Sequence, residues 1–182
     1  FNSVARYIMV LRDRSGRESL RRLEVRTLEH TESEYERSLV IFRTPLDISG
    51  TALLSHSRGV EDDLQWLYLP SLKRVKRISG ANRNAPFLGS EFSFEDLSPQ
   101  TLEKYTYEWS RAETLGAHVC DVLIRRPTFS RSGYRAQHLW IDQASRQIRR
   151  VVFYNRAEQL SKTLDLTEYQ HHHNRFWRAH LM

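Results

Sequence analysis

The chain has 182 residues, 40% of them hydrophobic and 27% charged, and a formal net charge of +6. This length corresponds to about one domain, and the composition is typical of a soluble globular protein. No apolar stretch approaches the ~20 residues of a membrane-spanning helix, and Cys120 is the only cysteine, so an internal disulfide is excluded. The basic excess favours anionic partners such as phospholipid head groups, acidic proteins or nucleic acid, or serves solubility alone.

The first half of the chain shows the two-residue alternation of β-strands. Ala5, Tyr7, Met9 and Leu11 share one face of the first run, and residues 13–16 form a turn. Further strands are expected around Leu23 to Thr27, at Tyr35 to Thr44, at Thr51 to Ser57 and at Leu64 to Leu69, with Pro45 ending the third run.

The stretch from Asp62 to Ser79 is the most informative. Trp66 and Tyr68 project to one side of the expected strand and Leu67 and Leu69 to the other, so both faces are apolar and need covers. A basic run follows directly, formed by Lys73, Arg74, Lys76 and Arg77. An apolar surface beside a cationic rim suits an amphiphilic anionic ligand. The alternative is an ordinary central strand followed by a solvated basic turn.

Residues 80–100 differ from the rest, since they combine turn-forming residues with Phe87, Phe92 and Phe94. We expect Ser90 to cap a short helix from Glu91 to Leu97, with acidic residues in its first turn. A helix this short must dock on the sheet, which predicts a lid or plug.

Strands resume at Lys104 and continue in consecutive hairpins to the end of the chain, at 104–110, 119–126, 134–142, 148–154, 160–169 and 176–182. About eleven or twelve short strands in sequence predict a mainly β, largely antiparallel meander that curls into a barrel or half-barrel. No linker is visible, so residues 1–182 are expected to form one domain. The chain opens on Phe1 rather than Met and stops inside a strand-like run, so we expect truncation at both ends.

An ordered set of short elements resembles the LolA-like outer-membrane lipoprotein-sorting proteins, in a periplasmic, uncharacterised branch. The elements are Phe42 with Pro45, Asp47 and Gly50-Thr51; Trp66 to Pro70; Arg77-Ile78-Ser79; Phe87, Gly89-Ser90, Phe92 and Asp96-Leu97; and Trp140-Ile141-Asp142, Tyr154 and Lys162. The resemblance implies an incomplete antiparallel β-barrel with an apolar cavity under a short helical lid, and transport without hydrolysis. The usual signal peptide and first helix of that family are not in this sequence.

No motif for catalysis, phosphate binding or a cofactor is present, so we expect neither an enzyme nor a cofactor. Glu61, Asp62 and Asp63 are ordinary acids of a turn. Adjacent strand residues face opposite ways, so His171, His172 and His173 favour a polar turn over a metal site. The stripe of Tyr105, Tyr107 and Trp109 could stack bases, but such stripes are more often core, and nucleic acid is not the expected partner. Cys120 lies in an apolar run and is expected to be a buried small hydrophobe.

The leading hypothesis is a periplasmic carrier or chaperone for a lipid, a lipoprotein acyl chain or other hydrophobic cargo, with an inner-membrane exporter and an outer-membrane acceptor as possible partners. The expected cavity or lid residues are Trp66, Tyr68, Phe92, Phe94, Tyr107 and Trp109. Lys73, Arg74, Lys76 and Arg77 are expected to meet anionic head groups, a transiently contacted membrane surface or a partner protein. The alternative is a protein-binding or sensor module of an envelope exporter that carries no lipid.

Overall fold

Over residues 2–29 and 36–182, the computed structural model consists of antiparallel β-sheets, short 3-10 turns and connecting loops. It divides into two compact units, Phe1–Lys104 and Tyr105–Met182. The predicted mainly β, antiparallel character is confirmed, whereas the single domain stays a prediction. None of the helices in the described residues is long and apolar enough to span a bilayer.

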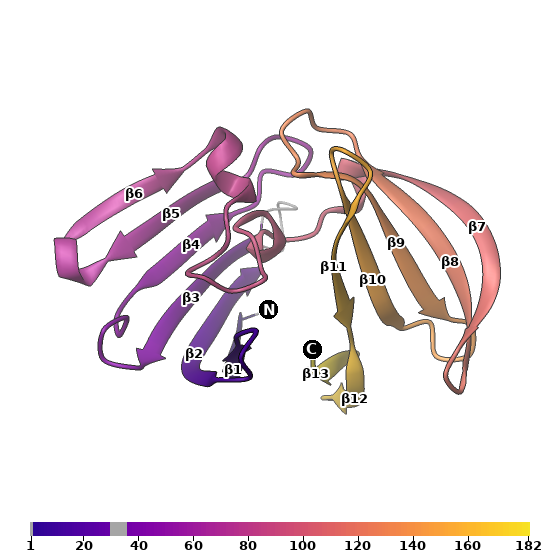
Figure 1. Cartoon of the computed structure of the whole chain (residues 1–182), viewed down its shortest axis with the longest axis horizontal. Helices are drawn as coiled ribbons and strands as arrows, with labels where there is room; N and C mark the ends of the chain where they lie inside the picture. The colour runs from indigo at the N-terminus through magenta and orange to yellow at the C-terminus, as the bar shows by residue number, and fades with distance from the viewer. Residues whose placement is uncertain (1, 30–35) are drawn as a thin grey trace. The chain divides into compact units, whose positions relative to one another are not determined.

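The first unit contains one six-stranded sheet in which the strands follow one another in chain order (Figure 1). Its strands are β1 (Asn2–Arg12), β2 (Glu18–Glu29), β3 (Glu36–Thr44), β4 (Ala52–His56), β5 (Leu64–Leu69) and β6 (Arg74–Ile78). Every neighbouring pair is antiparallel. The strands predicted in this half are therefore confirmed, except that residue 35, the expected start of the third run, lies outside the described residues.

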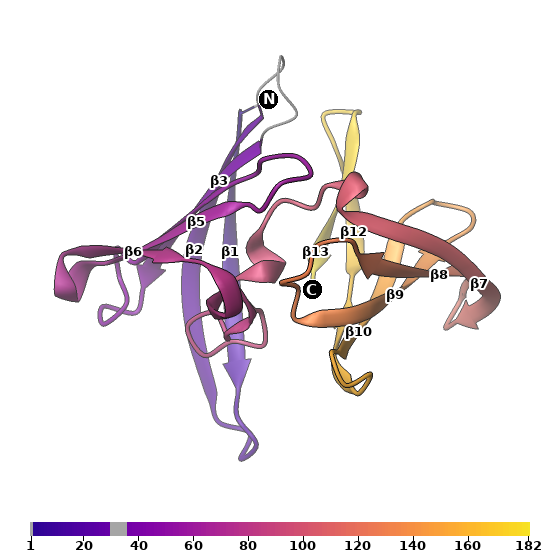
Figure 2. The same ribbon diagram turned by 90° about the horizontal axis from the view of Figure 1, so that it is seen from above.

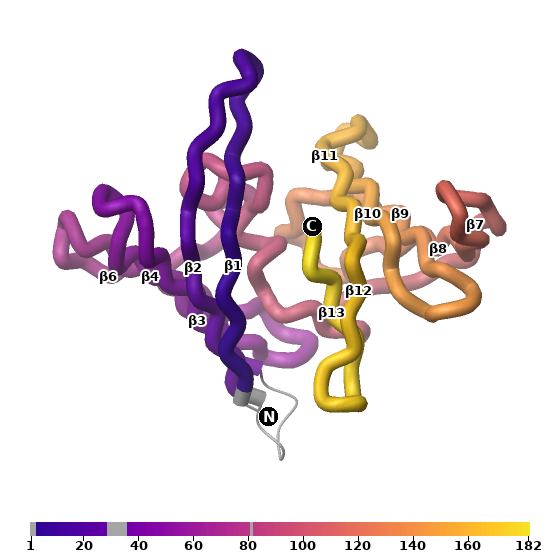
Figure 3. The backbone as a smooth tube through the Cα atoms, turned by 90° about the horizontal axis from the view of Figure 1, so that it is seen from below, coloured from indigo at the N-terminus to yellow at the C-terminus, as the bar shows by residue number. Residues whose placement is uncertain are grey.

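The hairpin of β1 and β2 extends well beyond β3 (Figure 3). Its strands pair as far as Arg12 and Glu18, whereas β3 begins to pair with β2 only at Arg22. The predicted turn between them is confirmed, because Asp13 Oδ1 accepts hydrogen bonds from the backbone N–H groups of Ser15 (2.8 Å) and Arg17 (3.0 Å). Such a local bond is the usual reason for aspartate at a turn.

Alternation along these strands sends their buried apolar side chains to one face, here called the inner face. Leu23, Val40, Phe42, Leu53, Leu67 and Ile78 are buried there in one hydrophobic cluster. Residues of the opposite parity, such as Leu54, Trp66 and Arg77, occupy the other face, here called the outer face. The inner face therefore carries the core of this unit.

The second unit contains a five-stranded sheet, in the order β11-β10-β9-β8-β7, and a separate hairpin (Figure 2). The strands are β7 (Tyr105–Leu115), β8 (His118–Pro127), β9 (Tyr134–Asp142), β10 (Ile148–Asn155) and β11 (Leu160–Asp165), followed by the hairpin of β12 (Thr167–His172) and β13 (Phe176–Leu181). The expected run 160–169 is thus two strands. They separate at Leu166, whose N–H bonds to Arg149 O (2.9 Å).

Both faces of the five-stranded sheet are buried in part. Tyr134, Leu139, Val151 and Phe153 form one cluster, and Cys120, Val122 and Trp140 form another. Leu139 and Trp140 are neighbours on β9 and therefore point to opposite faces. This unit accordingly has two small cores in place of one large core.

Candidate functional site

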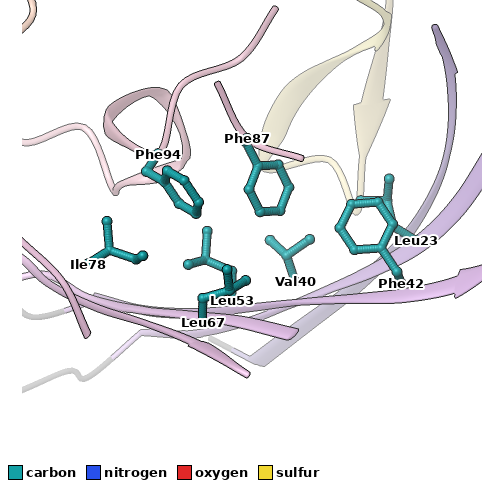
Figure 4. Close-up of a cluster of buried hydrophobic side chains, with 8 residues drawn as sticks. All are labelled: Leu23, Val40, Phe42, Leu53, Leu67, Ile78, Phe87 and Phe94. Atoms are coloured by element: carbon teal, nitrogen blue, oxygen red, sulfur yellow. The ribbon is translucent and has the colours of Figure 1, made fainter. Parts of the chain in front are cut away.

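Residues 80–104, here called the covering segment, close the inner face of the six-stranded sheet. Phe87 and Phe94 from this segment lie in the hydrophobic cluster with the strand side chains (Figure 4). The ring centroids of Phe87 and Phe42 are 5.5 Å apart, and those of Phe87 and Phe94 are 5.4 Å apart, edge to face. Aromatic pairs at such separations add to the free energy gained from burial. Two phenylalanines thus complete the core from outside the sheet.

A tight loop presents these two rings. Pro86 and Ser93 form an isolated antiparallel bridge, and the N–H of Phe87 donates to Phe92 O (2.6 Å). Leu88 and Gly89 both have positive φ, at 49° and 77°, which turns the chain at the tip. The loop is therefore a small unit that is hydrogen-bonded within itself and contributes no strand to the sheet.

The predicted helix from Glu91 to Leu97 with Ser90 as its cap is wrong. Only the 3-10 turn η3 (Glu95–Leu97) forms in that range. The Ser90 hydroxyl donates to Phe87 O (2.8 Å) inside the loop, so it is not a helix cap. Instead Ser93 and Asp96 bond reciprocally, since the Asp96 carboxylate accepts from Ser93 N–H (2.6 Å) and Ser93 Oγ accepts from Asp96 N–H (3.3 Å). Too few residues follow before Pro99 for a stable α-helix.

Polar groups of the sheet hold the loop through its backbone carbonyls. The fully buried Gln65 donates from Nε2 to Phe94 O (2.8 Å) and to Ser55 Oγ (3.0 Å). Arg21 Nη1 donates to Leu88 O (2.6 Å). Because carbonyls of a loop on an apolar face need partners, these bonds fix where the loop sits. Gln65 Oε1 has no hydrogen-bond partner among the described residues.

A buried ion cluster fastens both ends of the covering segment to one carboxylate. Asp63, just before β5, lies 2.5 Å from Lys104 Nζ through Oδ1 and 3.4 Å from Arg83 Nη2 through Oδ2. Arg83 also donates to Ser98 Oγ (3.2 Å). The three charged side chains are only 2–7% exposed. Arg83 belongs to η2 (Gly80–Asn84) and Lys104 to η4 (Leu102–Lys104), at the two ends of the segment.

The chain is similar to a described protein family and to several solved structures. A family model described as that of an uncharacterized protein matches residues 34–182. The chain is 41% identical to a putative outer membrane lipoprotein-sorting protein domain from Vibrio parahaemolyticus, with a TM-score of 0.93, covering 98% of this chain and 75% of that one. The chain belongs to the LolA-like outer-membrane lipoprotein-sorting protein family. The predicted resemblance is therefore confirmed.

Two further structures support the same fold. A DUF1329 family protein from Desulfovibrio piger is 27% identical, with a TM-score of 0.87 over 98% of this chain and 74% of that one. A LolA superfamily protein from Nitrosomonas europaea is 20% identical, with a TM-score of 0.67 over 93% of this chain and 70% of that one, and shows the fold alone. None of the curated proteins matches the chain.

In this LolA-like chain, the six predicted cavity or lid residues do not gather in one place. Phe94 is buried in the core on the inner face, and Phe92 is half-buried in the loop. Trp66 and Tyr68 lie on the outer face, because the alternate residues Gln65 and Leu67 point inward. Ligand contact by any of these residues stays a prediction.

Tyr107 and Trp109 belong to β7 in the second unit and are both exposed. The indole N–H of Trp109 donates to Asp121 Oδ1 (3.1 Å), and this bond, with one from Gln143, lowers the pKa of the Asp121 carboxyl. Trp109 thus has a defined polar partner on its own sheet. The ring of Tyr107 lies 6.4 Å from that of Tyr105.

The four predicted basic contacts are all exposed but face different ways. Lys73 closes the turn η1 (Pro70–Leu72) in a left-handed conformation, with φ of 49°. Arg77 pairs with Trp66 and so lies on the outer face, whereas Arg74 and Lys76 pair with Leu69 and Leu67 and share the side of the inner face. These cations therefore do not form one patch.

The remaining candidates are placed clearly. Cys120 is fully buried, which raises the pKa of its thiol and confirms its role as a small hydrophobe. No group of three or more potential metal ligands occurs within residues 2–29 and 36–182. His172 Nε2 lies 2.9 Å from His180 Nε2, a contact between β12 and β13 that joins two imidazoles by a hydrogen bond.

The covering segment's polar anchors are absent from the sequence-based prediction, which treated Asp63 as a turn acid. One local signal was available for Gln65, since it is the only polar residue in the run Leu64–Leu69. Nothing local marks Asp63, because its partners lie 20 and 41 residues further along the chain.

Proposed function

We propose that the protein is a non-enzymatic periplasmic carrier that binds the acyl chain of a lipid or lipoprotein on the inner face of the six-stranded sheet. The observation that carries this proposal is the covering of a broad apolar face by Phe87 and Phe94 from a loop that pairs with no strand of the sheet. Displacing that loop would uncover the face without breaking a strand. Membership of the lipoprotein-sorting family supports this role.

The free energies of burial are compatible with displacement by cargo. Burying a phenylalanine side chain is worth about 1.5–3 kcal/mol, so Phe87 and Phe94 together contribute about 3–6 kcal/mol. An acyl chain gains about 0.8 kcal/mol per buried methylene, so roughly ten methylenes gain about 8 kcal/mol. A long acyl chain would therefore outcompete the two rings, while the returning rings would assist its release.

The anchors suggest which part of the covering segment moves. Arg83 and Lys104 hold both ends of the segment on Asp63, where breaking a buried ion pair is costly. The loop between them depends on hydrogen bonds from Gln65 and Arg21 and on the two rings. In the proposed mechanism the ends stay fixed and the loop swings away with Phe87 and Phe94.

The compartment and the partners proposed for the carrier follow from the same family relationship. We propose that the protein works in the periplasm, receives cargo from an inner-membrane exporter and delivers it to an outer-membrane acceptor. The incomplete β-barrel expected from the sequence also remains a proposal, supported by the family relationship. The proposed cargo carries an acyl chain long enough to displace the loop.

Organic extraction of the purified protein with mass spectrometry, together with uptake of a fluorescent fatty acid, tests the proposal. The wild type is expected to yield or to take up acyl chains. The double variant Phe87→Ala/Phe94→Ala is expected to take up the probe about tenfold faster, because the loop no longer competes as strongly. Where the double variant fails to fold, Phe87→Leu weakens the plug while keeping an apolar side chain.

The control is Phe176→Ala, which removes an exposed phenylalanine from β13 in the second unit and should leave uptake unchanged. Absence of extracted lipid together with absence of uptake by wild type and variants would refute the carrier. A protein-binding or sensor module of an exporter would then be the better description.

A further inference from the structure

The outer face of the six-stranded sheet is uncovered in the first unit and combines apolar and basic side chains. The register places two rows across it. One row contains Glu24, Ile41, Ala52, Tyr68 and Val75, and the next contains Arg26, Leu39, Leu54, Trp66 and Arg77. Val4, Arg6, Ile8 and Val10 continue this face on β1, opposite Arg26, Glu24, Arg22 and Leu20 of β2.

Its apolar side chains are largely accessible. Val4, Ile8, Leu20 and Val75 are each 60–65% exposed, on strands β1, β2 and β6. Trp66 is half-buried on β5, the strand beside the edge strand β6. Val4, Ile8 and Leu20 lie together on the paired strands β1 and β2, and exposed apolar side chains gathered in this way indicate a surface that a membrane or another molecule covers.

The charges on this face are almost entirely basic. Glu24 accepts a hydrogen bond from Arg26 (2.7 Å) and lies 3.2 Å from Arg43, and these contacts lower the pKa of the Glu24 carboxyl. The negative charge of Glu24 is therefore paired with two arginines of the same face. Within residues 2–29 and 36–182, the guanidinium groups of Arg6, Arg22 and Arg77 have no side-chain partner. Three cations thus remain available for an anionic ligand.

We propose that the outer face of the six-stranded sheet docks on the anionic surface of a phospholipid membrane. At such a surface, guanidinium groups bind lipid phosphates while neighbouring aliphatic side chains enter the acyl boundary. The alternation of Val4, Arg6 and Ile8 along one strand matches both demands at once. Trp66 and Tyr68 suit the head-group layer, which favours these two residue types.

Other occupants fit the face less well. Protein interfaces are depleted of charged residues at their centre and place them on the rim. Here Arg6 stands between Val4 and Ile8, where a protein partner would leave it desolvated. A second copy of the chain would set the same unpaired arginines against each other, which like-charge repulsion opposes.

This inference goes beyond the proposed carrier function, since it involves the opposite face of the sheet and no cargo. An anionic membrane attracts each basic residue that comes near it, and the attraction falls with salt because the charges are solvated. Binding is therefore expected to be modest, reversible and sensitive to ionic strength.

The test is flotation of the full chain with vesicles of phosphatidylglycerol and phosphatidylcholine, compared with phosphatidylcholine alone. Wild type is expected to float with the anionic vesicles at low salt and to stay behind with the neutral ones. Arg22→Glu/Arg77→Glu, on the outer face, should lower the partition coefficient about tenfold or more. Ile8→Ser/Val75→Ser should lower it without a change of charge.

The matched control is Arg74→Glu/Lys76→Glu, which changes the net charge equally and lies on β6, as Arg77 does, but on the other side of the sheet. Its partition coefficient should stay within about threefold of wild type. Failure of the wild type to float with anionic vesicles overturns the proposal, as an acidic protein partner would then explain the face better. Equal losses in both charge-reversal pairs overturn it too. Fatty-acid uptake should be unchanged in the outer-face variants, which separates this proposal from the carrier function.

Discussion

The ammonium group of Lys104 lies 2.5 Å from Oδ1 of Asp63, across 41 residues of chain, and both side chains are almost fully buried. The other carboxylate oxygen faces Arg83. One carboxylate therefore pairs with two cations, one near each end of the covering segment. Asp63 therefore anchors both ends of the covering segment to the sheet.

Replacing Asp63 should be among the most destabilising changes in the first unit. Asp63→Asn removes the carboxylate charge that faces two buried cations, which should lower the free energy of unfolding by about 3–5 kcal/mol. Urea unfolding followed by circular dichroism measures this loss. Glu18→Gln serves as the control, because it breaks an exposed pair with Arg12 and should cost less than about 1 kcal/mol. Equal small losses in both variants would mean that the buried cluster does not anchor the segment.

Gln65 should control how often the loop opens. In Gln65→Leu the loop loses the hydrogen bond to Phe94 O, and a buried carbonyl without a partner costs about 1–3 kcal/mol. Amide hydrogen exchange of residues 85–97 should accelerate, while that of β3 and β4 should change less. Gln170→Leu, at an exposed position of β12, should leave exchange in the loop unaltered. Unchanged exchange in Gln65→Leu would show that the rings alone hold the loop.

Gly50 and Gly16 have nearly the same backbone conformation but differ in the space around them, so alanine substitutions at the two positions can be compared directly. Both have left-handed φ, at 81° and 82°, so alanine should cost about 1–2 kcal/mol at either position. At Gly50 an added Cβ would also meet Pro70 Cγ at 3.2 Å, whereas at Gly16 it would meet nothing within 4 Å. Gly50→Ala should therefore lower the denaturation midpoint more than Gly16→Ala. The reverse order would contradict the close approach of Gly50 to Pro70.

His138 should make stability depend on pH. Burial lowers its pKa, with a smaller contribution from the positive charges of Arg111 and Arg126. A histidine whose folded pKa lies below its unfolded value binds protons more readily when unfolded, so its contribution is present at neutral pH. That contribution is lost as pH falls from about 6.5 towards the folded pKa.

The measurement is the free energy of unfolding between pH 7.5 and 5.5, where few carboxyl groups titrate. Wild type should lose stability over this range, and His138→Phe should reduce the loss while keeping the contacts with Trp140 and Tyr154. His173→Phe, at an exposed position in the turn of the C-terminal hairpin, is the control and should keep the wild-type slope. A slope in His138→Phe equal to wild type would assign the dependence to other histidines.

The strands of this protein were predictable because each one is a local pattern. Tyr7 and Met9, or Val40 and Phe42, alternate with their neighbours in a period that only a strand uses, and Pro45 directly follows the third strand. The helix at Glu91 to Leu97 was not predictable in the same way. Its acidic start and apolar spacing suit a helix, but the Ser93–Asp96 bonds and the loop pairing of Phe87 with Phe92 take precedence.

The candidate site was also predictable only where a local pattern marks it. The sequence indicates an apolar surface around Trp66 and Leu67 and phenylalanines in the covering segment, but both faces of β5 are apolar, so the covered face cannot be read from it. Placement of Phe94 on Leu67 rather than on Trp66 depends on Gln65, which shares the inner face and binds the loop.

The sequence by itself determined the mainly antiparallel β character, the order of the strands, the burial of Cys120 and the family, since each follows from local alternation or from ordered motifs along the chain. Tertiary structure alone decided which face of the six-stranded sheet is covered, and that Asp63 holds Arg83 and Lys104. It also decided that Gln65 holds the loop through Phe94 O. These features join residues far apart in sequence or separate close neighbours, and both effects arise from strand register and long-range packing that no local pattern encodes.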